Sequence, residues 1–254
     1  MTAWCRFTLS GDDAVRFGAL EADQVVEYAG DLFREPSPTG RRYRRDDVVL
    51  KAPFVPNHII GIGKNFSAPD DDRPPMPDLP LLFMKPTTSA IGPGEALLLP
   101  PGSDRVLIEA EIAVVIGKSG KRLTPEEAES HIFGYTVAND ASCPEYYHPE
   151  GHWTIGKSFD TFCPLGPVVQ TDFDWRNARI RSWVNGEPRQ DAPSALMIMP
   201  IPEMVAWISK FMTLQPGDVI LTGTPRGAPA IGAGDRVVCV VDGIGELENV
   251  VRAE

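Results

Sequence analysis

Two glutamates, Glu109 and Glu111, stand at the start of an apolar run that continues to Gly117. The β-branched residues of this run predict a strand over residues 107–117, and the lack of alternation after Glu111 predicts burial on both faces. Side chains two positions apart in a strand point to the same side, roughly 6–7 Å from each other. Two carboxylates held that closely repel each other unless a cation lies between them. The pattern therefore indicates a divalent-cation site, with a solvated strand end as the alternative.

Asp140 and Lys157 are the next residues whose surroundings point to chemistry. Asp140 directly follows an apolar run that predicts another buried strand, and functional residues are often placed where strands give way to loops. A turn formed by Asn139 and Asp140 is the alternative. Lys157 lies between Trp153 and Phe159 in the sequence, which is typical of a partly buried ammonium group. The alternative is a lysine that keeps its charge in water.

The composition limits the classes of protein and partner. The chain has 254 residues, with 35 acidic against 24 basic residues and a net charge of −11. An acidic excess disfavours nucleic acid and anionic membrane surfaces as partners. No apolar run approaches the ~20 residues of a transmembrane helix, and the N-terminus lacks a signal-peptide pattern. The four cysteines have no Cys-x-x-Cys spacing, so we expect reduced, structural thiols in a cytoplasmic protein.

The sequence predicts two parts, a small N-terminal β unit over residues 1–54 and a catalytic, metal-binding domain over residues 55–254. In the first part, strands are expected at residues 4–9, 14–20 and 25–28. Prolines and a basic run at residues 35–45 break this pattern and predict an exposed linker. In the second part, the proline- and aspartate-rich residues 67–75 predict a mobile loop.

The larger part is expected to consist mostly of strands, at residues 58–63, 81–86, 96–100, 107–117, 134–139, 181–184, 219–221 and 237–241. The pair Asn185 and Gly186 predicts a hairpin turn. A capping-box pattern that begins at Thr124 predicts a helix over residues 124–132. Apolar residues at helical spacing predict a second helix from Pro202 to about Met212. Strands without regular βαβ alternation argue against a Rossmann fold or a TIM barrel.

The candidate residues belong to an ordered series of motifs. In sequence order these are Lys85-Pro86, Glu109-x-Glu111 before Val114-Val115-Ile116-Gly117-Lys118, Gly134-Tyr135-Thr136, Asn139-Asp140-x-Ser142, Gly156-Lys157-Ser158-Phe159-Asp160, Val184-Asn185-Gly186, Thr213-Leu214-x-Pro216-Gly217-Asp218 and Thr222-Gly223-Thr224-Pro225. Over about residues 55–250 the series resembles that of the fumarylacetoacetate hydrolase family. Residues 1–50 match only the small N-terminal extension that is common in this family.

The resemblance implies a fold, an assembly and a site. The fold is α+β and mostly β, a mixed β-roll with a small N-terminal β unit, usually as a homodimer. The implied ligands of Mg²⁺ or Mn²⁺ are Glu109, Glu111 and Asp140, with Lys157 beside the metal. The residues expected to contact the substrate are Lys64, Asn65, Lys85, Gly223 and Thr224. Of these, Thr224 is implied at the substrate carboxylate, and Lys64 is a candidate for a remote one.

The chain departs from the family pattern at the lid. Hydrolases of the family carry the motif Asn-Tyr-x-x-His-x-x-Glu, in which the His–Glu pair activates the attacking water. Here the run that begins at Asn65 has Phe66, Pro69 and Asp72 in the last three of these positions. The acid–base pair is therefore absent in its usual form, which weakens the expectation of a hydrolase.

A second departure follows Asp140. The run that leads through Glu145 to Pro149 is similar to the decarboxylase half of the bifunctional homoprotocatechuate-pathway decarboxylase/isomerase. We predict that one of two histidines in this loop, His148 or preferably His152, replaces the missing base, with Glu145 as a further catalytic candidate. Two exposed loop histidines without a role are the alternative.

The implied substrate is a small 2-oxo dicarboxylic acid. Such an acid can chelate the metal, and its enolate would be stabilised by the metal and by Lys157. We expect decarboxylation or isomerisation. One alternative is hydrolysis of a C–C bond in an acylpyruvate of the fumarylacetoacetate type. Another is a non-catalytic dimeric binding protein on the same fold, against which the intact acidic residues and Lys157 argue.

Overall fold

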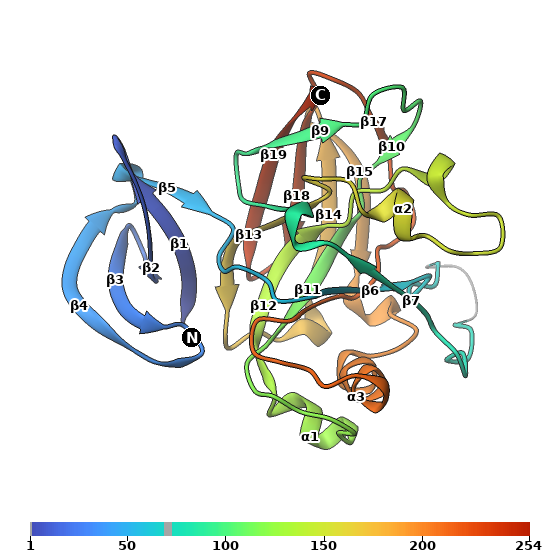
Figure 1. Ribbon diagram of the computed structural model, residues 1–254, viewed down its shortest axis with the longest axis horizontal. Helices are drawn as coiled ribbons and strands as arrows, with labels where there is room; N and C mark the ends of the chain where they lie inside the picture. Colours follow the sequence, from blue (N-terminus) through green and yellow to red (C-terminus); the bar gives the residue numbers. More distant parts are fainter. Residues whose placement is uncertain (1, 69–72) are drawn as a thin grey trace.

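The computed structural model describes residues 2–68 and 73–254 and shows a mostly β molecule (Figure 1). The lid positions Pro69 and Asp72, with the rest of residues 69–72 of the expected mobile loop, lie outside the described residues. Two sheets contain most of the strands and pack against each other through β11, β12 and β13. This arrangement confirms the expected α+β, mostly β fold with mixed sheets.

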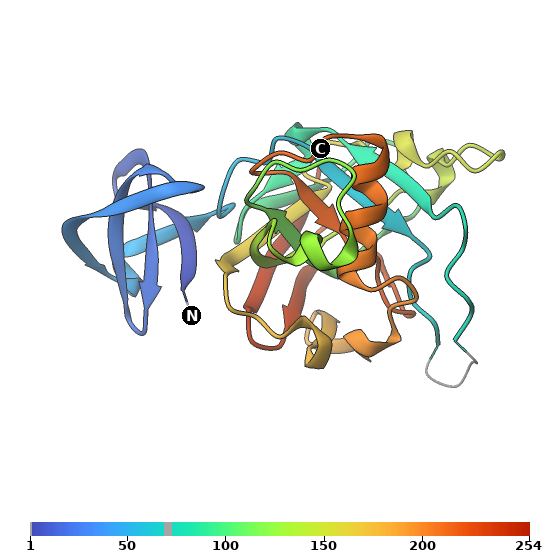
Figure 2. The same ribbon diagram turned by 90° about the horizontal axis from the view of Figure 1, so that it is seen from below.

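The larger sheet joins the N-terminal strands to the centre of the molecule. Its order is β4-β3-β2-β1-β13-β12-β11-β16-β6-β7, with β5 beside β1 and β8 beside β13. The bounds are β1 Ala3–Leu9, β2 Asp12–Glu21, β3 Gln24–Asp31, β4 Arg34–Arg44, β5 Val48–Lys51, β6 Ile59–Gly63, β7 Leu81–Lys85, β8 Ala90–Ile91, β11 Ala110–Ile116, β12 Ile132–Asn139, β13 Cys163–Gln170 and β16 Val219–Leu221. Strands β1–β5 stand to one side of the rest (Figures 1 and 2). We propose a domain boundary near residue 54.

The smaller sheet has the order β15-β14-β18-β19-β9. Its strands are β9 Ala96–Leu99, β14 Arg179–Val184, β15 Glu187–Pro193, β18 Arg236–Val241 and β19 Gly245–Ala253, and a separate pair joins β10 Val106–Leu107 to β17 Ala230–Ile231. The predicted hairpin is confirmed between β14 and β15. Its turn residues Asn185 and Gly186 have φ angles of 53° and 81°, as a type I′ turn requires.

Short helices lie between the strands. Those in the described residues are the α-helices α1 Pro125–Glu129, α2 Thr154–Lys157 and α3 Ile201–Phe211, and the 3₁₀-helices η1 Arg45–Asp47, η2 Thr87–Ser89, η3 Pro144–Tyr146, η4 Trp175–Asn177 and η5 Ser194–Leu196. Helix α1 has the predicted capping box between Thr124 and Glu127. Helix α3 confirms the second predicted helix. Helix α2 was not predicted, because a single turn is too short to show a helical period. No helix in the described part of the chain has the length and hydrophobicity needed to cross a bilayer.

The main core lies between the two sheets and α3. It includes the fully buried Ile112 of β11, Ile180 of β14 and Ile208 of α3. On its other face β11 buries Ala113 and Val115 in a second cluster. Both faces of β11 are therefore packed, as predicted, which fixes the strand that carries the acidic residues. The four cysteines are free and buried, in agreement with the expected structural thiols.

The expectation of a linker at residues 35–45 is wrong, because these residues belong to strand β4. Strand β4 pairs only with β3 and lies at the edge of the sheet. An edge strand tolerates Pro36 and Pro38, whose missing N–H groups would disrupt an inner strand. The basic run is exposed, as expected, and Arg42 lies 3.0 Å from the carboxylate of Glu21.

The expected continuous strand at residues 107–117 is interrupted, because Glu109 lies between β10 and β11. Hydrogen bonds to the end of β12 nevertheless continue across this break. The backbone N–H of Glu109 donates to the side-chain oxygen of Asn139 (3.0 Å), and the N–H of Asp140 donates to the carbonyl of Glu109 (2.9 Å). Glu109 is therefore held beside Asp140 by these hydrogen bonds rather than by strand geometry alone.

Candidate active site

Glu109, Glu111 and Asp140 converge where β11 begins and β12 ends. One carboxylate oxygen from each residue lies within 4.8 Å of the other two. The two strands are antiparallel, and Ala110 lies opposite Asn139. This register places the start of β11 beside the residue that follows β12. Glu111 and Asp140 are buried, whereas Glu109 is half-buried. The predicted acidic triad is thus brought together by strand pairing.

Two buried lysines neutralise part of this negative charge. The Lys157 ammonium donates to Asp140 Oδ2 (2.5 Å) and to Glu109 Oε2 (2.7 Å). Lys85 donates to the other oxygen of Asp140 (2.5 Å) and to the carbonyl of Ala141 (3.0 Å). Burial favours the neutral form of Asp140, but the charges of Lys157 and Lys85 hold the pKa of this carboxyl below its usual value. Asp140 is therefore the shared anion of two ammonium groups.

Lys157 is charged although it is almost wholly buried. Burial disfavours its ammonium form, yet the carboxylates of Asp140 and Glu109 raise the pKa of Lys157 well above its usual value. Its Nζ lies 4.9 Å from the ring centre of Phe83 and 5.9 Å from that of Trp153. Trp153 is the aromatic neighbour that the sequence indicated, and Phe83 is a second one from β7.

Glu111 has no comparable cationic partner. The backbone N–H of Gly223 donates to its Oε2 (2.8 Å), and no ion pair to Glu111 occurs among the described residues. Burial, together with the charges of Asp140 and Glu109, raises the pKa of Glu111 well above its usual value. A buried carboxylate in this position is favourable only beside a cation. Three carboxylates fit a hard divalent ion such as Mg²⁺ or Mn²⁺, which prefers oxygen ligands.

The acidic triad forms one wall of a hollow of about 270 Å³. Phe83 and Trp153 line it beside the triad and Lys157, and residues 223–228 line it from the C-terminal part of the chain. The exposed cationic residues Lys64 and Arg226 also belong to its lining. The hollow is of a size for a small molecule and has positive side chains as well as the acidic triad.

The predicted substrate-contacting residues divide into two groups. Lys64, Gly223 and Thr224 line the hollow, whereas Asn65 and Lys85 are buried outside its lining. Asn65 donates to the backbone carbonyl of Thr222 (2.8 Å) and exchanges hydrogen bonds with the backbone of Met199 (3.1 and 2.8 Å). These contacts fix the segment that follows β6 against the loop that carries Gly223.

The remaining catalytic candidates lie in residues 144–153, which comprise η3 and the loop that leads from it to α2. His148, His152 and Glu145 are exposed and are not among the described residues that line the hollow. The rings of the two histidines have centres 5.9 Å apart, and the N–H of His148 donates to the carbonyl of His152 (2.8 Å). Glu145 accepts from the N–H of Asp104 (3.1 Å). Trp153, directly after His152, does line the hollow, so the loop borders the site.

The sequence analysis assigned no role to three further residues at or near the site. Ser142 donates to Glu109 Oε1 (3.0 Å), Arg226 lines the hollow, and Gln190 bonds to the segments that carry Glu111 and Thr224. The motif containing Ser142 was visible beside Asp140. No sequence signal marked Gln190, because its contacts depend on how the two sheets pack.

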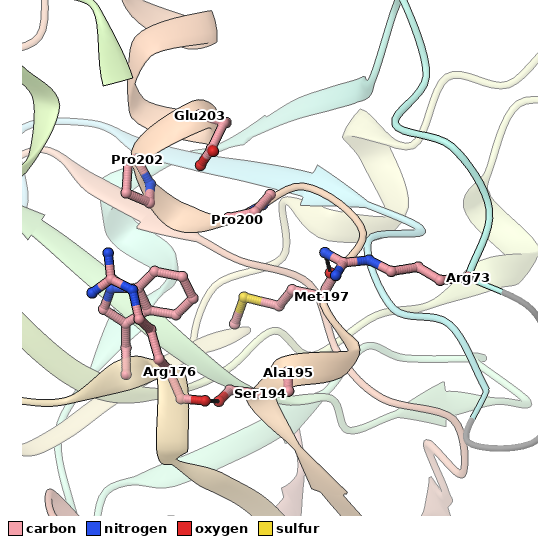
Figure 3. A pocket seen from close by; sticks show the side chains of 9 residues that line it. Arg73, Arg176, Ser194, Ala195, Met197, Pro200, Pro202 and Glu203 are labelled. Carbon is pink, nitrogen blue, oxygen red and sulfur yellow. Dashed lines mark hydrogen bonds between the residues drawn. The ribbon is translucent and has the colours of Figure 1, made fainter. Parts of the chain in front are cut away.

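A different hollow, of about 360 Å³, lies between η4, η5 and the start of α3 (Figure 3). Arg176 and Arg73 stand on opposite sides of it, with the side chain of Met197 between them. Arg73 donates to the carbonyls of Met197 and Ile198. This hollow is larger than the one beside the triad, but Glu203 is the only acidic residue in its lining among the described residues. Size alone therefore does not identify the active site.

Comparison with known proteins gives family matches for both parts of the chain. Residues 58–252 match the model of the fumarylacetoacetate (FAA) hydrolase C-terminal domain, and residues 3–53 match the Rv2993c-like N-terminal model. The chain is 40% identical over 221 residues to oxaloacetate tautomerase fahd2, mitochondrial, of Xenopus laevis, which covers 82% of this chain and 69% of the relative.

Solved structures share the whole fold. The 5-carboxymethyl-2-hydroxymuconate delta-isomerase of Mycobacterium smegmatis superposes with a TM-score of 0.93 at 40% identity and full coverage of both chains. The maleylpyruvate hydrolase of Sphingobium sp. SYK-6, solved with manganese(II) and pyruvate, has a TM-score of 0.84 at 28% identity and covers 100% of this chain and 99% of its own. The chain belongs to the fumarylacetoacetate hydrolase family and is an enzyme of the isomerase or lyase type.

Proposed function

We propose that this enzyme isomerises a small 2-oxo dicarboxylic acid, by keto–enol or double-bond tautomerisation, with Mg²⁺ or Mn²⁺ bound at Glu109, Glu111 and Asp140. The observation that carries the proposal is the buried acidic triad with the Lys157 ammonium in contact with two of its members. The manganese ion of the Sphingobium hydrolase supports a divalent cation in a related protein.

The bound cation and the side chains around it would have separate roles in the reaction. When bound, a divalent cation supplies Lewis-acid stabilisation of negative charge on a keto oxygen. Lys157 holds a permanent positive charge at the same wall of the hollow, where it would stabilise charge that develops on the substrate oxygen. Phe83 and Trp153 shield this ammonium from water, which strengthens its electrostatic effect.

Lys64 and Arg226 support a substrate with a second carboxylate. Both residues line the hollow and are exposed, so a chain-like acid held at the triad can reach a cation at its other end. Thr224, in the same lining, is our candidate contact for the first carboxylate. The names of the relatives agree with this class, because oxaloacetate and 5-carboxymethyl-2-hydroxymuconate carry more than one carboxylate.

Proton transfer at carbon requires a base that the triad does not provide, because its carboxylates would hold the metal. We propose His152, with His148 as the second candidate, since their loop is continuous with Trp153 in the lining of the hollow. The exposed position of both rings means that the loop must bring one of them inward. Glu145, in the same loop, is a weaker candidate because it is bonded to the backbone of Asp104.

Decarboxylation is the second candidate reaction, because loss of CO₂ leaves the electron pair of the broken C–C bond in the enolate of the shortened 2-oxo acid, which the same cation and ammonium would stabilise. C–C bond hydrolysis is the third, favoured by the likeness to the maleylpyruvate hydrolase and disfavoured by the absence of the usual lid His–Glu pair from the sequence. We also propose a homodimer, on the basis of the family resemblance.

One experiment separates these reactions. The protein is freed of metal with a chelator, reloaded with Mg²⁺ or Mn²⁺, and incubated with oxaloacetate and, separately, with an acylpyruvate. Loss of the enol ultraviolet absorbance of oxaloacetate without CO₂ release is the expected result. Release of CO₂ would favour the decarboxylase, and pyruvate plus a second acid from the acylpyruvate would favour the hydrolase. A metal-loaded protein that changes none of these compounds would contradict an enzyme for this substrate class.

A further inference from the structure

The side chain of Gln190 connects the two sheets directly behind the acidic triad. Gln190 lies in β15 of the smaller sheet and is 2% exposed. Its Oε1 accepts from the backbone N–H of Ala110 (3.1 Å) and from the hydroxyl of Ser182 (2.9 Å). Its Nε2 donates to Thr224 Oγ1 (2.8 Å) and to the carbonyl of Pro225 (2.8 Å). All four hydrogen-bonding positions of the amide are therefore occupied.

Ala110, which accounts for one of these bonds, lies between Glu109 and Glu111. Strand β16 pairs with β11 only as far as Leu221, opposite Ala113. Beyond that point the chain leaves the ladder, so on this side of β11 the Ala110 backbone has no partner strand, while β12 pairs with β11 on the other side. Gln190 accepts from its N–H, and the Thr224 hydroxyl donates to its carbonyl (2.8 Å). Two side chains thus replace the missing strand at this residue.

The contacts form a closed ring. The Gln190 amide bonds to Ala110 and to Thr224, and Thr224 bonds back to Ala110. The same loop donates the N–H of Gly223 to the carboxylate of Glu111 (2.8 Å). The orientation of both glutamates and the position of the loop therefore depend on one amide that contacts no carboxylate of the triad and does not itself line the hollow.

We infer that Gln190 is a positioning residue that sets the geometry of the proposed metal site and of the Thr224 loop. Residues that hold metal ligands from behind typically contribute about 10- to 100-fold to metal affinity or activity. The inference rests on the proposed metal site, but it does not depend on which reaction the enzyme performs.

The test compares two buried amides. In Gln190→Leu all four hydrogen bonds are lost. The control is Asn249→Leu. Asn249 is a buried amide in β19 that donates to the carbonyls of Gly92 and Glu95, away from the triad. Thermal melting and Mn²⁺ titration calorimetry are measured for each variant and for the natural protein.

We expect both variants to melt at lower temperature, but only Gln190→Leu to bind Mn²⁺ about 10- to 100-fold more weakly. Equal Mn²⁺ affinity in Gln190→Leu and the natural protein, or an equal loss in both variants, would overturn the inference. If Gln190→Leu does not fold, Gln190→Glu is measured instead, with KM as its readout.

Gln190→Glu also separates the hydrogen bond to Ala110 from the hydrogen bonds to Thr224 and Pro225. Its carboxylate keeps the oxygen that accepts from Ala110 but lacks the donors to Thr224 and Pro225. We expect KM to rise about tenfold while Mn²⁺ affinity changes less. A KM and an Mn²⁺ affinity that both match the natural protein would overturn the role.

The outcomes for the natural protein distinguish the two proposals. A natural protein that binds no Mn²⁺ would overturn the metal site and this inference together. One that binds Mn²⁺ but converts no 2-oxo acid would overturn the proposed reaction alone.

Discussion

The acidic triad with its two lysines and the loop at residues 144–153 are two contrasting parts of one candidate site. In the first, Asp140 and Lys157 are about 1% exposed and joined by short ionic hydrogen bonds. In the second, His148 and His152 are exposed and contact mainly their own loop. The part proposed to stabilise charge is buried and specified by the fold. The part proposed to move protons lies on a segment that can change without disturbing the core.

The largest effect is expected from removing the shared anion. Asp140→Ala should abolish metal-dependent turnover and reduce the free energy of unfolding by about 3–5 kcal/mol, because Lys85 and Lys157 are left buried without it. Activity assays and chemical denaturation measure the two effects. Asp160→Ala, which removes an exposed acid, is the control and should change neither. Full activity in Asp140→Ala would refute the site.

The two proposed roles of the site, binding of the cation by the triad and stabilisation of substrate charge by Lys157, can be separated by changing Lys157. Lys157→Met should lower kcat by about 10²- to 10³-fold, the range for loss of one group that stabilises a developing oxyanion. Mn²⁺ binding should persist, since removal of the ammonium leaves Glu109 and Asp140 to be neutralised by the metal. Steady-state kinetics and calorimetry test this, with the exposed Lys210→Met as control. A kcat within a few-fold of the natural value would show that Lys157 is structural only.

The loop is tested by removing both of its histidines. The double variant His148→Ala, His152→Ala should lose about 10²-fold in kcat, the lower range for a general base, with little effect on stability because both side chains are exposed. The limb of the pH–rate profile that belongs to the base should also disappear. If turnover and its pH profile are unchanged, the loop histidines have no catalytic role.

The smallest effect concerns pH and metal binding. Because the pKa of Glu111 is raised in the metal-free protein, a proton competes with the cation for this carboxylate as the pH falls. Mn²⁺ affinity should therefore increase with rising pH, up to the pH at which Glu111 is already ionised in the metal-free protein. Below that pH, binding should release about one proton per ion. Calorimetry in buffers of different ionisation enthalpy measures this release. A pH-independent affinity would show that no proton competes with the cation at Glu111.

The sequence predicted the convergence of acidic residues more reliably than the local structure that produces it. The spacing of Glu109 and Glu111 and the motif at Asp140 led to the correct cluster, although Glu109 is outside the strand. Local signals also predicted α1, α3 and the hairpin at Asn185. These features depend on residues close in sequence, whose preferences can be judged without the rest of the fold.

What could not be predicted depends on tertiary packing. Lys85 was expected at the substrate, but it lies outside the lining of the hollow and donates to Asp140. This contact depends on the position of β7 in the sheet. Strand β4 was taken for a linker, because tolerance of Pro36 and Pro38 depends on being at a sheet edge. Gln190 could not be recognised at all, since its four bonds reach three separate segments of the chain.

The balance of formal charges at the triad has a consequence for the order of binding. Three carboxylates face two ammonium groups, so once Glu111 is ionised the metal-free cluster has one excess negative charge. A substrate carboxylate would be repelled from such a wall. A divalent cation reverses the excess to a single positive charge, which one carboxylate then cancels. With the proposed metal site, we therefore expect ordered binding, in which the ion binds first and creates the attraction that retains the acid.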